Sequence, residues 1–163
     1  MTRILFVCLG NICRSPTAEA VMRGLIAERG LGDEIEVDSA GVGDWHIGKG
    51  PDERAIEAGA RRGIEVGGQA RQVAREDFER FDWIVAMDDR NIDSLRELSA
   101  GDPDIPEPML LRSFDPEAVA SGELEVPDPY YGGEDHFDAV VDLVKRGCEG
   151  LLDAVEADRA SAQ

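Results

Sequence analysis

The chain has 163 residues, enough for one hydrophobic core but short of two ordinary domains, and its 42% hydrophobic and 32% charged residues are typical of a water-soluble globular protein. With 17 basic and 35 acidic side chains the net charge is −18, which argues against nucleic acid as a partner. The longest apolar run, Ile4–Leu9, is far shorter than the roughly 20 residues of a membrane span, and it does not form a secretory signal. We therefore expect a cytoplasmic protein without membrane insertion, while secretion by a route that lacks a standard signal stays open.

The cysteines and histidines give no indication of a disulfide framework or a metal site. The three cysteines, Cys8, Cys13 and Cys148, are an odd number in a chain that can fold without disulfides, which favours a reducing compartment. His46 and His136 are isolated, so we expect both to be solvated and predict no metal or cofactor. Cys148 lies in an apolar helical stripe and is expected to be an inert core residue.

The first part of the chain predicts a strand, a tight loop, a helix and a second strand. Residues 4–8 are apolar on both faces, which is typical of a central parallel strand. After a short loop, Ser15 is expected to cap a helix with Pro16 at its first position, and apolar residues recur at helical spacing until Gly30. Residues 35–38 alternate between polar and apolar, as an edge strand does.

The remaining segments continue the alternation of strands and helices. A second fully apolar strand at 83–87 lies between helical patterns at 53–61 and 91–98. A short strand at 109–111 follows a proline-rich stretch, and an apolar stripe over 137–155 predicts a long final helix. The predicted order is therefore βαβαβαβα.

This order predicts a single doubly wound α/β domain over residues 1–158, with residues 159–163 as a frayed tail. Right-handed crossovers and the edge-like second strand give a four-stranded parallel sheet of order 2-1-3-4 with helices on both faces. The topological switch point then lies at Cys8 and the loop after it, where such sheets bind ligands. The sequence does not fix the oligomeric state, for which we favour a monomer.

The loop after the first strand has the features of a phosphate-binding site. Gly10 allows a tight turn, and the loop leads into a helix N-terminus whose free amides favour an anion. The same amides stabilise a thiolate, so Cys8 can act as a nucleophile while Arg14 binds two phosphate oxygens. No Gly-Lys-Ser/Thr sequence follows the strand, which excludes a Walker-type nucleotide loop.

Two motifs resemble the low-molecular-weight protein tyrosine phosphatases: Val7–Pro16 (VCLGNICRSP) and Asp128-Pro129-Tyr130-Tyr131. Shorter similar segments are Ser39-Ala40-Gly41, Trp45-His46, Ala70-Arg71-Gln72, Ala86-Met87-Asp88 and Leu111–Asp115. The resemblance therefore covers nearly the whole chain.

That resemblance implies metal-independent hydrolysis of protein phosphotyrosine through a phosphocysteine. Cys8 would be the nucleophile, Arg14 the phosphate clamp, and Asp128 the general acid and then the general base. Ser15 would donate a hydrogen bond to the thiolate, and Asn11 would brace the loop. Independently of the resemblance, Asp128 suits its role because it precedes a proline in a loop flanked by glycine, where it is held extended and can reach a leaving oxygen.

The resemblance also implies the groups that bind substrate, which would be phosphotyrosine proteins. They are the loop residues Leu9, Gly10, Asn11, Ile12, Cys13 and Ser15 and the aromatic walls Trp45, Tyr130 and Tyr131. Ile12 favours phosphotyrosine over phosphoarginine, because similar enzymes that act on phosphoarginine carry a threonine at that position. Cys13 is placed to capture an oxidised Cys8 as a disulfide, so we expect a redox-sensitive thiol.

One segment departs from the family pattern. Family members often carry a histidine shortly before the Ala-Arg-Gln segment, where it supports the loop asparagine, whereas this chain has Gly67-Gly68-Gln69. The brace of Asn11 is therefore either missing or supplied by Gln69 or a water molecule.

Two other functional classes are open at this point. A thiol redox enzyme of the arsenate-reductase type would use Cys8 and Cys13, but it also needs cysteines near the middle of the chain, and none lies between Cys13 and Cys148. A silent anion-binding module would not need Asp128. An assay with para-nitrophenyl phosphate and no added metal separates the three hypotheses.

Overall fold

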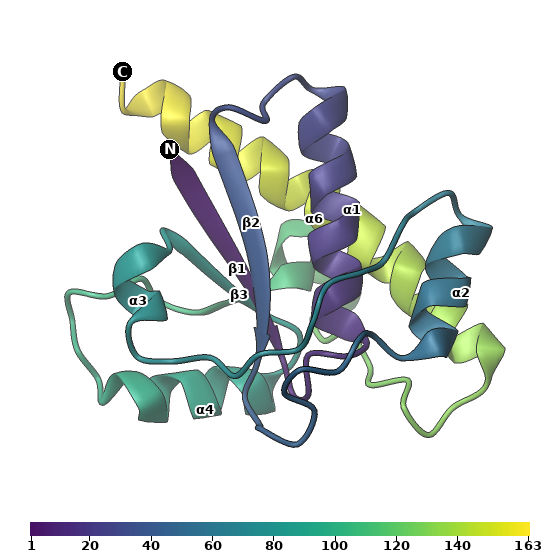
Figure 1. Cartoon of the computed structure of the whole chain (residues 1–163). Coiled ribbons are helices and arrows are strands. Elements are labelled where there is room, and N and C mark those ends of the chain that lie inside the picture. Colours follow the sequence, from purple (N-terminus) through teal and green to yellow (C-terminus); the bar gives the residue numbers. More distant parts are fainter.

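A four-stranded parallel sheet forms the centre of the fold in the computed structural model, which describes residues 1–163 (Figure 1). The strands are β1 (Thr2–Cys8), β2 (Ile35–Gly41), β3 (Trp83–Ala86) and β4 (Met109–Leu110). Their order is β2-β1-β3-β4, with every neighbouring pair parallel. The predicted single α/β domain and the strand order 2-1-3-4 are confirmed.

Seven helical segments surround the sheet. They are α1 (Arg14–Glu28), α2 (Glu53–Arg61), α3 (Asp77–Arg80), α4 (Asp89–Ser99), the 3₁₀ helix η1 (Leu111–Phe114), α5 (Pro116–Ser121) and α6 (Glu134–Ser161). The sequence analysis did not predict α3, η1 and α5, because segments of four to six residues are too short to show a helical period. None of the helices combines the length and the apolar character needed to span a membrane.

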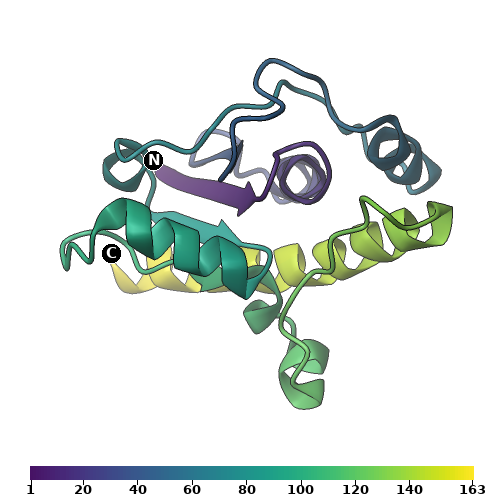
Figure 2. The same ribbon diagram turned by 90° about the horizontal axis from the view of Figure 1, so that it is seen from below.

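Strand β1 is buried on both faces, as its continuous apolar run predicts. Ile4 and Phe6 pack into a core with α1 and α6, and Leu5 and Val7 pack into a second core on the opposite face, with α3 and α4. Figure 2 shows α4 on the near side of the sheet and α6 running behind it. The loop to α1 begins at the carboxyl end of β1.

All four strands differ in length from the prediction. β1 begins two residues before the predicted segment 4–8, and β3 ends one residue before the end of the predicted segment 83–87. β2 continues three residues beyond the alternating segment 35–38, because Ser39, Ala40 and Gly41 pair with the end of β1. β4 ends at Leu110, since Leu111 turns into η1 and enters the core. The extension of β2 bears on the site, because it includes Ser39, whose hydroxyl accepts a hydrogen bond from Asn11 in the β1–α1 loop (3.0 Å).

The end of α6 is held against the N-terminal strand. Arg159 donates a hydrogen bond to the Thr2 hydroxyl (2.8 Å) and pairs with Glu34 (3.0 Å). The helix therefore runs to Ser161, beyond residue 158 at which the sequence analysis ended the domain. Apolar periodicity could not indicate this extension, because the contacts are polar. Both chain termini lie at the end of the sheet opposite the β1–α1 loop (Figure 1).

Candidate active site

The loop between β1 and α1 curls around the Cys8 sulfur. Asn11 has a left-handed backbone (φ 58°) and its amide donates to Cys8 Sγ at 3.3 Å. Gly41, the last residue of β2, allows the loop to pack closely, because a Cβ there would lie 3.0 Å from the Asn11 nitrogen. The backbone thus directs amide groups toward the place where a phosphate bound to Cys8 would lie.

The N-terminus of α1 is open to an anion. Cys13 occupies the N-cap position without a side-chain hydrogen bond, so the first amides of the helix have no side-chain acceptor. The prediction that Ser15 caps the helix is wrong: Ser15 lies within α1, and its hydroxyl is 3.0 Å from Cys8 Sγ. The hydroxyl is thus within hydrogen-bonding distance of the sulfur, and either atom can be the donor.

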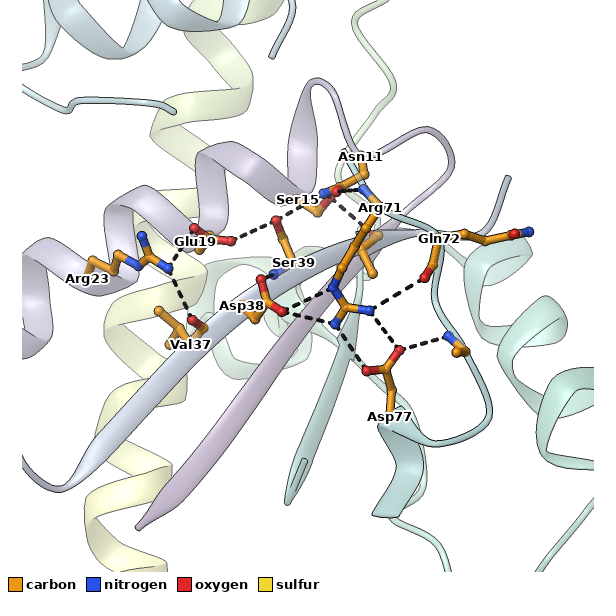
Figure 3. Close-up of polar contacts among 12 residues, drawn as sticks. Asn11, Ser15, Glu19, Arg23, Val37, Asp38, Ser39, Arg71, Gln72 and Asp77 are labelled. Atoms are coloured by element: carbon orange, nitrogen blue, oxygen red, sulfur yellow. Dashed lines mark hydrogen bonds and ion pairs between the residues drawn. The ribbon is translucent and has the colours of Figure 1, made fainter. Parts of the chain in front are cut away.

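Asn11 is buried and fully braced, which answers the question raised by Gly67-Gly68-Gln69 (Figure 3). Its Nδ2 donates to Ser15 Oγ (2.8 Å) and to Ser39 Oγ (3.0 Å), and its Oδ1 accepts from the Arg71 backbone amide (3.0 Å). Gln69 takes no part in these bonds. The expectation of a missing brace, or of one from Gln69, is therefore wrong, because Ser39 and the Arg71 backbone supply it.

The groups that brace Asn11 are themselves anchored on two helices (Figure 3). Ser39 Oγ donates to Glu19 Oε1 at 2.9 Å, and Glu19 pairs with Arg23 at 3.0 Å on α1. Burial raises the pKa of Glu19, although the hydrogen bond from Ser39 and the charge of Arg23 oppose the shift. The Arg71 guanidinium pairs with Asp77 at the start of α3 (3.0 Å). The loop is therefore held from two sides.

Arg14 is buried with part of its guanidinium already engaged. Nη1 donates to Asp88 Oδ2 at 2.6 Å and to the Val126 carbonyl at 3.0 Å, which leaves Nε and Nη2 without hydrogen bonds in the protein. Burial acts to lower the pKa of Arg14, but Cys8 and Asp88 outweigh it and hold the pKa above its ordinary value. Arg14 is thus a fixed cation with two nitrogens available to an anion.

Asp88 contacts the candidate site, although the sequence analysis assigned it no role. It follows β3 and caps α4 by accepting from the Asn91 amide at 2.9 Å, while its other oxygen holds Arg14. The indication in the sequence was its position directly after a buried strand, at the carboxyl edge of the sheet where ligands bind.

Asp128 lies beside the guanidinium of Arg14, at the entrance to the site. Its Oδ2 is 3.7 Å from Arg14 Nη2, and its Oδ1 accepts from the Tyr130 amide at 3.2 Å. The side chain is partly exposed, so it can approach a ligand that enters from solvent.

These residues line one cavity of about 230 Å³. Its lining is Cys8, Leu9, Gly10, Ile12, Cys13, Arg14, Trp45, His46, Asp128, Tyr130 and Tyr131. Every candidate site residue from the sequence is in this set except Asn11 and Ser15, which lie beneath the loop and hold Cys8. A larger hollow of the surface, about 600 Å³, contains no cysteine, serine or threonine.

The rim of the cavity is aromatic and exposed. Tyr131 is 97% exposed and its ring meets that of Tyr130 edge to face, 5.0 Å between centroids. Arg54 lies 5.5 Å from the Tyr130 ring centroid and is held by Asp52 at 2.9 Å, an arrangement that the sequence analysis missed. His46, expected to be solvated, is half-buried and forms part of the cavity wall.

The two remaining cysteines are both buried. Burial, together with Asp52, raises the pKa of the Cys13 thiol in the cavity wall, and burial raises that of Cys148. Cys148 belongs to the core beneath α1, where its thiol lies 3.8 Å from the Ala18 carbonyl oxygen. It is therefore a core residue, as predicted, and not available to Cys8 as an exchange partner.

Comparisons with known proteins agree with this geometry. The sequence profile of the family described as low molecular weight phosphotyrosine protein phosphatase matches residues 3–161. A low molecular weight protein-tyrosine-phosphatase of Streptomyces coelicolor is 48% identical over 153 residues, which is 94% of this chain and 93% of the relative. A crystal structure of a protein tyrosine phosphatase from Entamoeba histolytica has a TM-score of 0.89 at 38% identity and covers 98% of this chain and 99% of its own. A Drosophila arginine phosphatase has a TM-score of 0.85 at 32% identity, with coverage of 95% and 98%. The chain belongs to the low molecular weight phosphotyrosine protein phosphatase family, as the resemblance of its motifs predicted.

Proposed function

We propose that the chain hydrolyses phosphotyrosine in proteins through a covalent phosphocysteine at Cys8. The observation that carries this proposal is that Cys8, Arg14 and Asp128 line one cavity, whose entrance is aromatic. A nucleophile, a fixed cation and a carboxyl group at the entrance are the groups that a two-step phosphate transfer requires.

In the first step, the Cys8 thiolate attacks phosphorus and the bond to the tyrosine oxygen breaks. The Ser15 hydroxyl at 3.0 Å and the Asn11 amide at 3.3 Å stabilise the negative charge on sulfur. The open N-terminus of α1 adds its dipole to the same effect.

Arg14 binds two of the non-bridging phosphate oxygens through Nε and Nη2. Its Nη1 is fixed by Asp88 and by the Val126 carbonyl, so the guanidinium is oriented before substrate arrives. A preorganised charge of this kind stabilises the transition state without the cost of reorienting a dipole during the reaction.

Asp128 serves both steps. As an acid it protonates the phenolate oxygen that leaves, and the resulting carboxylate then takes a proton from the water that attacks the phosphocysteine. Its place beside Arg14 Nη2, at 3.7 Å, supports this role, because the phosphate that Arg14 binds would bring the leaving oxygen to the same side of the cavity.

The walls select the group that carries the phosphate. Trp45, Tyr130 and Tyr131 can stack on a flat ring, and the short side chains of phosphoserine and phosphothreonine would leave these walls uncovered. The likeness to an arginine phosphatase shows that the fold alone does not decide between a phenol and a guanidinium. Ile12 decides against phosphoarginine, because its side chain offers no hydroxyl to pair with a buried N–H.

The test is a comparison of kcat/KM on peptides that contain phosphotyrosine, phosphoserine or phosphoarginine. We expect the wild type to prefer phosphotyrosine by at least about 100-fold over phosphoserine, and Ile12→Thr to raise activity on phosphoarginine by about tenfold. The matched control is Ile56→Thr, an exposed isoleucine on α2 outside the cavity, which should change neither ratio. Equal rates on phosphoserine and phosphotyrosine, or a wild-type preference for phosphoarginine, would contradict the proposal.

A further inference from the structure

Arg112 is a buried arginine outside the cavity whose place in the fold calls for an explanation. It lies on η1, is 7% exposed and forms no ion pair. The only hydrogen bond of its side chain runs from Nη1 to the Glu125 carbonyl at 2.7 Å, and its Nε is buried without a partner. Burying a cation without a counter-ion is an unfavourable way to stabilise a fold. The contact with the Glu125 carbonyl is therefore the one polar interaction that the buried guanidinium makes.

The Glu125 carbonyl belongs to the loop that leads to Asp128. This loop has no helix or strand, yet it is fixed at two successive residues. The Val126 amide donates to Met87 (2.8 Å) and its carbonyl accepts from Arg14 (3.0 Å), while the preceding carbonyl accepts from Arg112. Two buried guanidinium groups thus hold neighbouring carbonyls of one loop, one from within the cavity and one from outside it.

Arg112 extends from a rigid base. Leu111 beside it is fully buried, and η1 lies directly against α6. Gly147 and Gly150 on α6 allow this approach, because a Cβ at Gly150 would overlap the Phe114 carbonyl. Because η1 is packed against α6, the Arg112 guanidinium holds the Glu125 carbonyl in a fixed position relative to α6.

The chain between Glu125 and Asp128 is stiff enough to transmit a displacement. Pro127 and Pro129 have a fixed φ, and the residues before them, Val126 and Asp128, are restricted to extended conformations. A shift of the Glu125 carbonyl would therefore be passed along the chain to Asp128, opposed only by the two hydrogen bonds that hold Val126.

We propose that Arg112 is a positioning residue for the reaction, which sets through the Glu125 carbonyl the point from which Asp128 reaches the leaving oxygen. This inference rests on the proposed role of Asp128 as the general acid. Arg14 holds the same loop but also binds the phosphate, whereas Arg112 does not line the cavity. A change at Arg112 therefore removes no direct contact of Arg14 and no residue of the cavity wall.

The test uses two substrates that depend differently on a general acid. Phenol leaves poorly without a proton, whereas para-nitrophenol leaves readily. We expect Arg112→Met to lower kcat/KM by about tenfold on phenyl phosphate and by about twofold or less on para-nitrophenyl phosphate, because a misplaced acid costs most where protonation is needed most. Arg96→Met, which removes an exposed arginine on α4, is the matched control and should leave both rates unchanged.

A double-mutant cycle distinguishes positioning from a general structural effect. In an Asp128→Ala background, Arg112→Met should cause no further loss on phenyl phosphate. Arg112→Lys keeps a hydrogen-bond donor, so its kcat/KM on phenyl phosphate should fall less than that of Arg112→Met. If Arg112→Met does not fold, Arg112→Lys replaces it in the double-mutant cycle with Asp128→Ala. Equal losses on the two substrates, or losses that multiply in the Asp128→Ala background, would overturn the inference. A wild type inactive on both substrates would instead overturn the proposed function, and the inference with it.

Discussion

Asn11 allows the most quantitative test of how the phosphate loop is held. Asn11→Ala removes three hydrogen bonds, to Ser15, Ser39 and the Arg71 amide, each worth about 1 kcal/mol. It also places a residue without a favourable side-chain contact at φ 58°, which costs about 1 kcal/mol more. The expected loss of unfolding free energy is therefore about 4 kcal/mol. Asn11→Gly removes the same bonds, but glycine adopts a left-handed backbone without strain. The expected loss of unfolding free energy for this variant is therefore about 3 kcal/mol.

Ala100 provides the calibration within the same chain. It is the other non-glycine residue with a left-handed backbone (φ 52°), at the end of α4. Ala100→Gly should stabilise the protein by about 1 kcal/mol, and the difference between Asn11→Gly and Asn11→Ala should match that gain. Urea unfolding of the four proteins measures all these values. If Asn11→Gly is as stable as the wild type, the bonds do not hold the loop and the reasoning fails.

The remaining predictions concern three other side chains. Asp88→Asn keeps a cap on α4 but removes the charge that holds Arg14, so kcat/KM should fall about tenfold; an unchanged kcat/KM would refute the role of the pair. Burial raises the pKa of Glu19, so the folded carboxyl binds its proton more tightly than the unfolded one and stability falls as pH rises above 4.5. Glu19→Gln should therefore gain stability relative to the wild type as pH rises above 4.5 in thermal unfolding, whereas a difference independent of pH would contradict the shift. After peroxide treatment, dithiothreitol should restore wild-type activity more fully than that of Cys13→Ser; equal recovery would show that Cys13 does not protect Cys8.

The sequence predicted the features that depend on local periodicity and on one contiguous loop. The apolar run of β1, the helical spacing in α1 and α6, and the edge character of β2 each report on burial of that element alone. The place of Cys8 followed from the same reasoning, because a central strand that ends at a switch point directs its next residues into the site.

The sequence could not predict contacts between segments that have no pattern of their own. The brace of Asn11 comes from Ser39 and from a backbone amide 60 residues away, and a backbone group leaves no trace in the sequence. Asp88 and Arg112 act through single hydrogen bonds to distant groups, and each could equally have been a surface residue. Only the folded backbone brings these partners together.

The most direct measurement of the central claim is acid quenching during turnover of para-nitrophenyl phosphate, followed by mass spectrometry of the peptide that contains Cys8 and Cys13. We expect this peptide to carry one acid-stable phosphoryl group in Asp128→Ala, where hydrolysis of the intermediate is slowed, and in the same variant with Cys13→Ser. Cys8→Ser should carry none and should have no turnover. Turnover by Cys8→Ser, or turnover by the wild type that stops when EDTA is added, would contradict a phosphocysteine mechanism at this site.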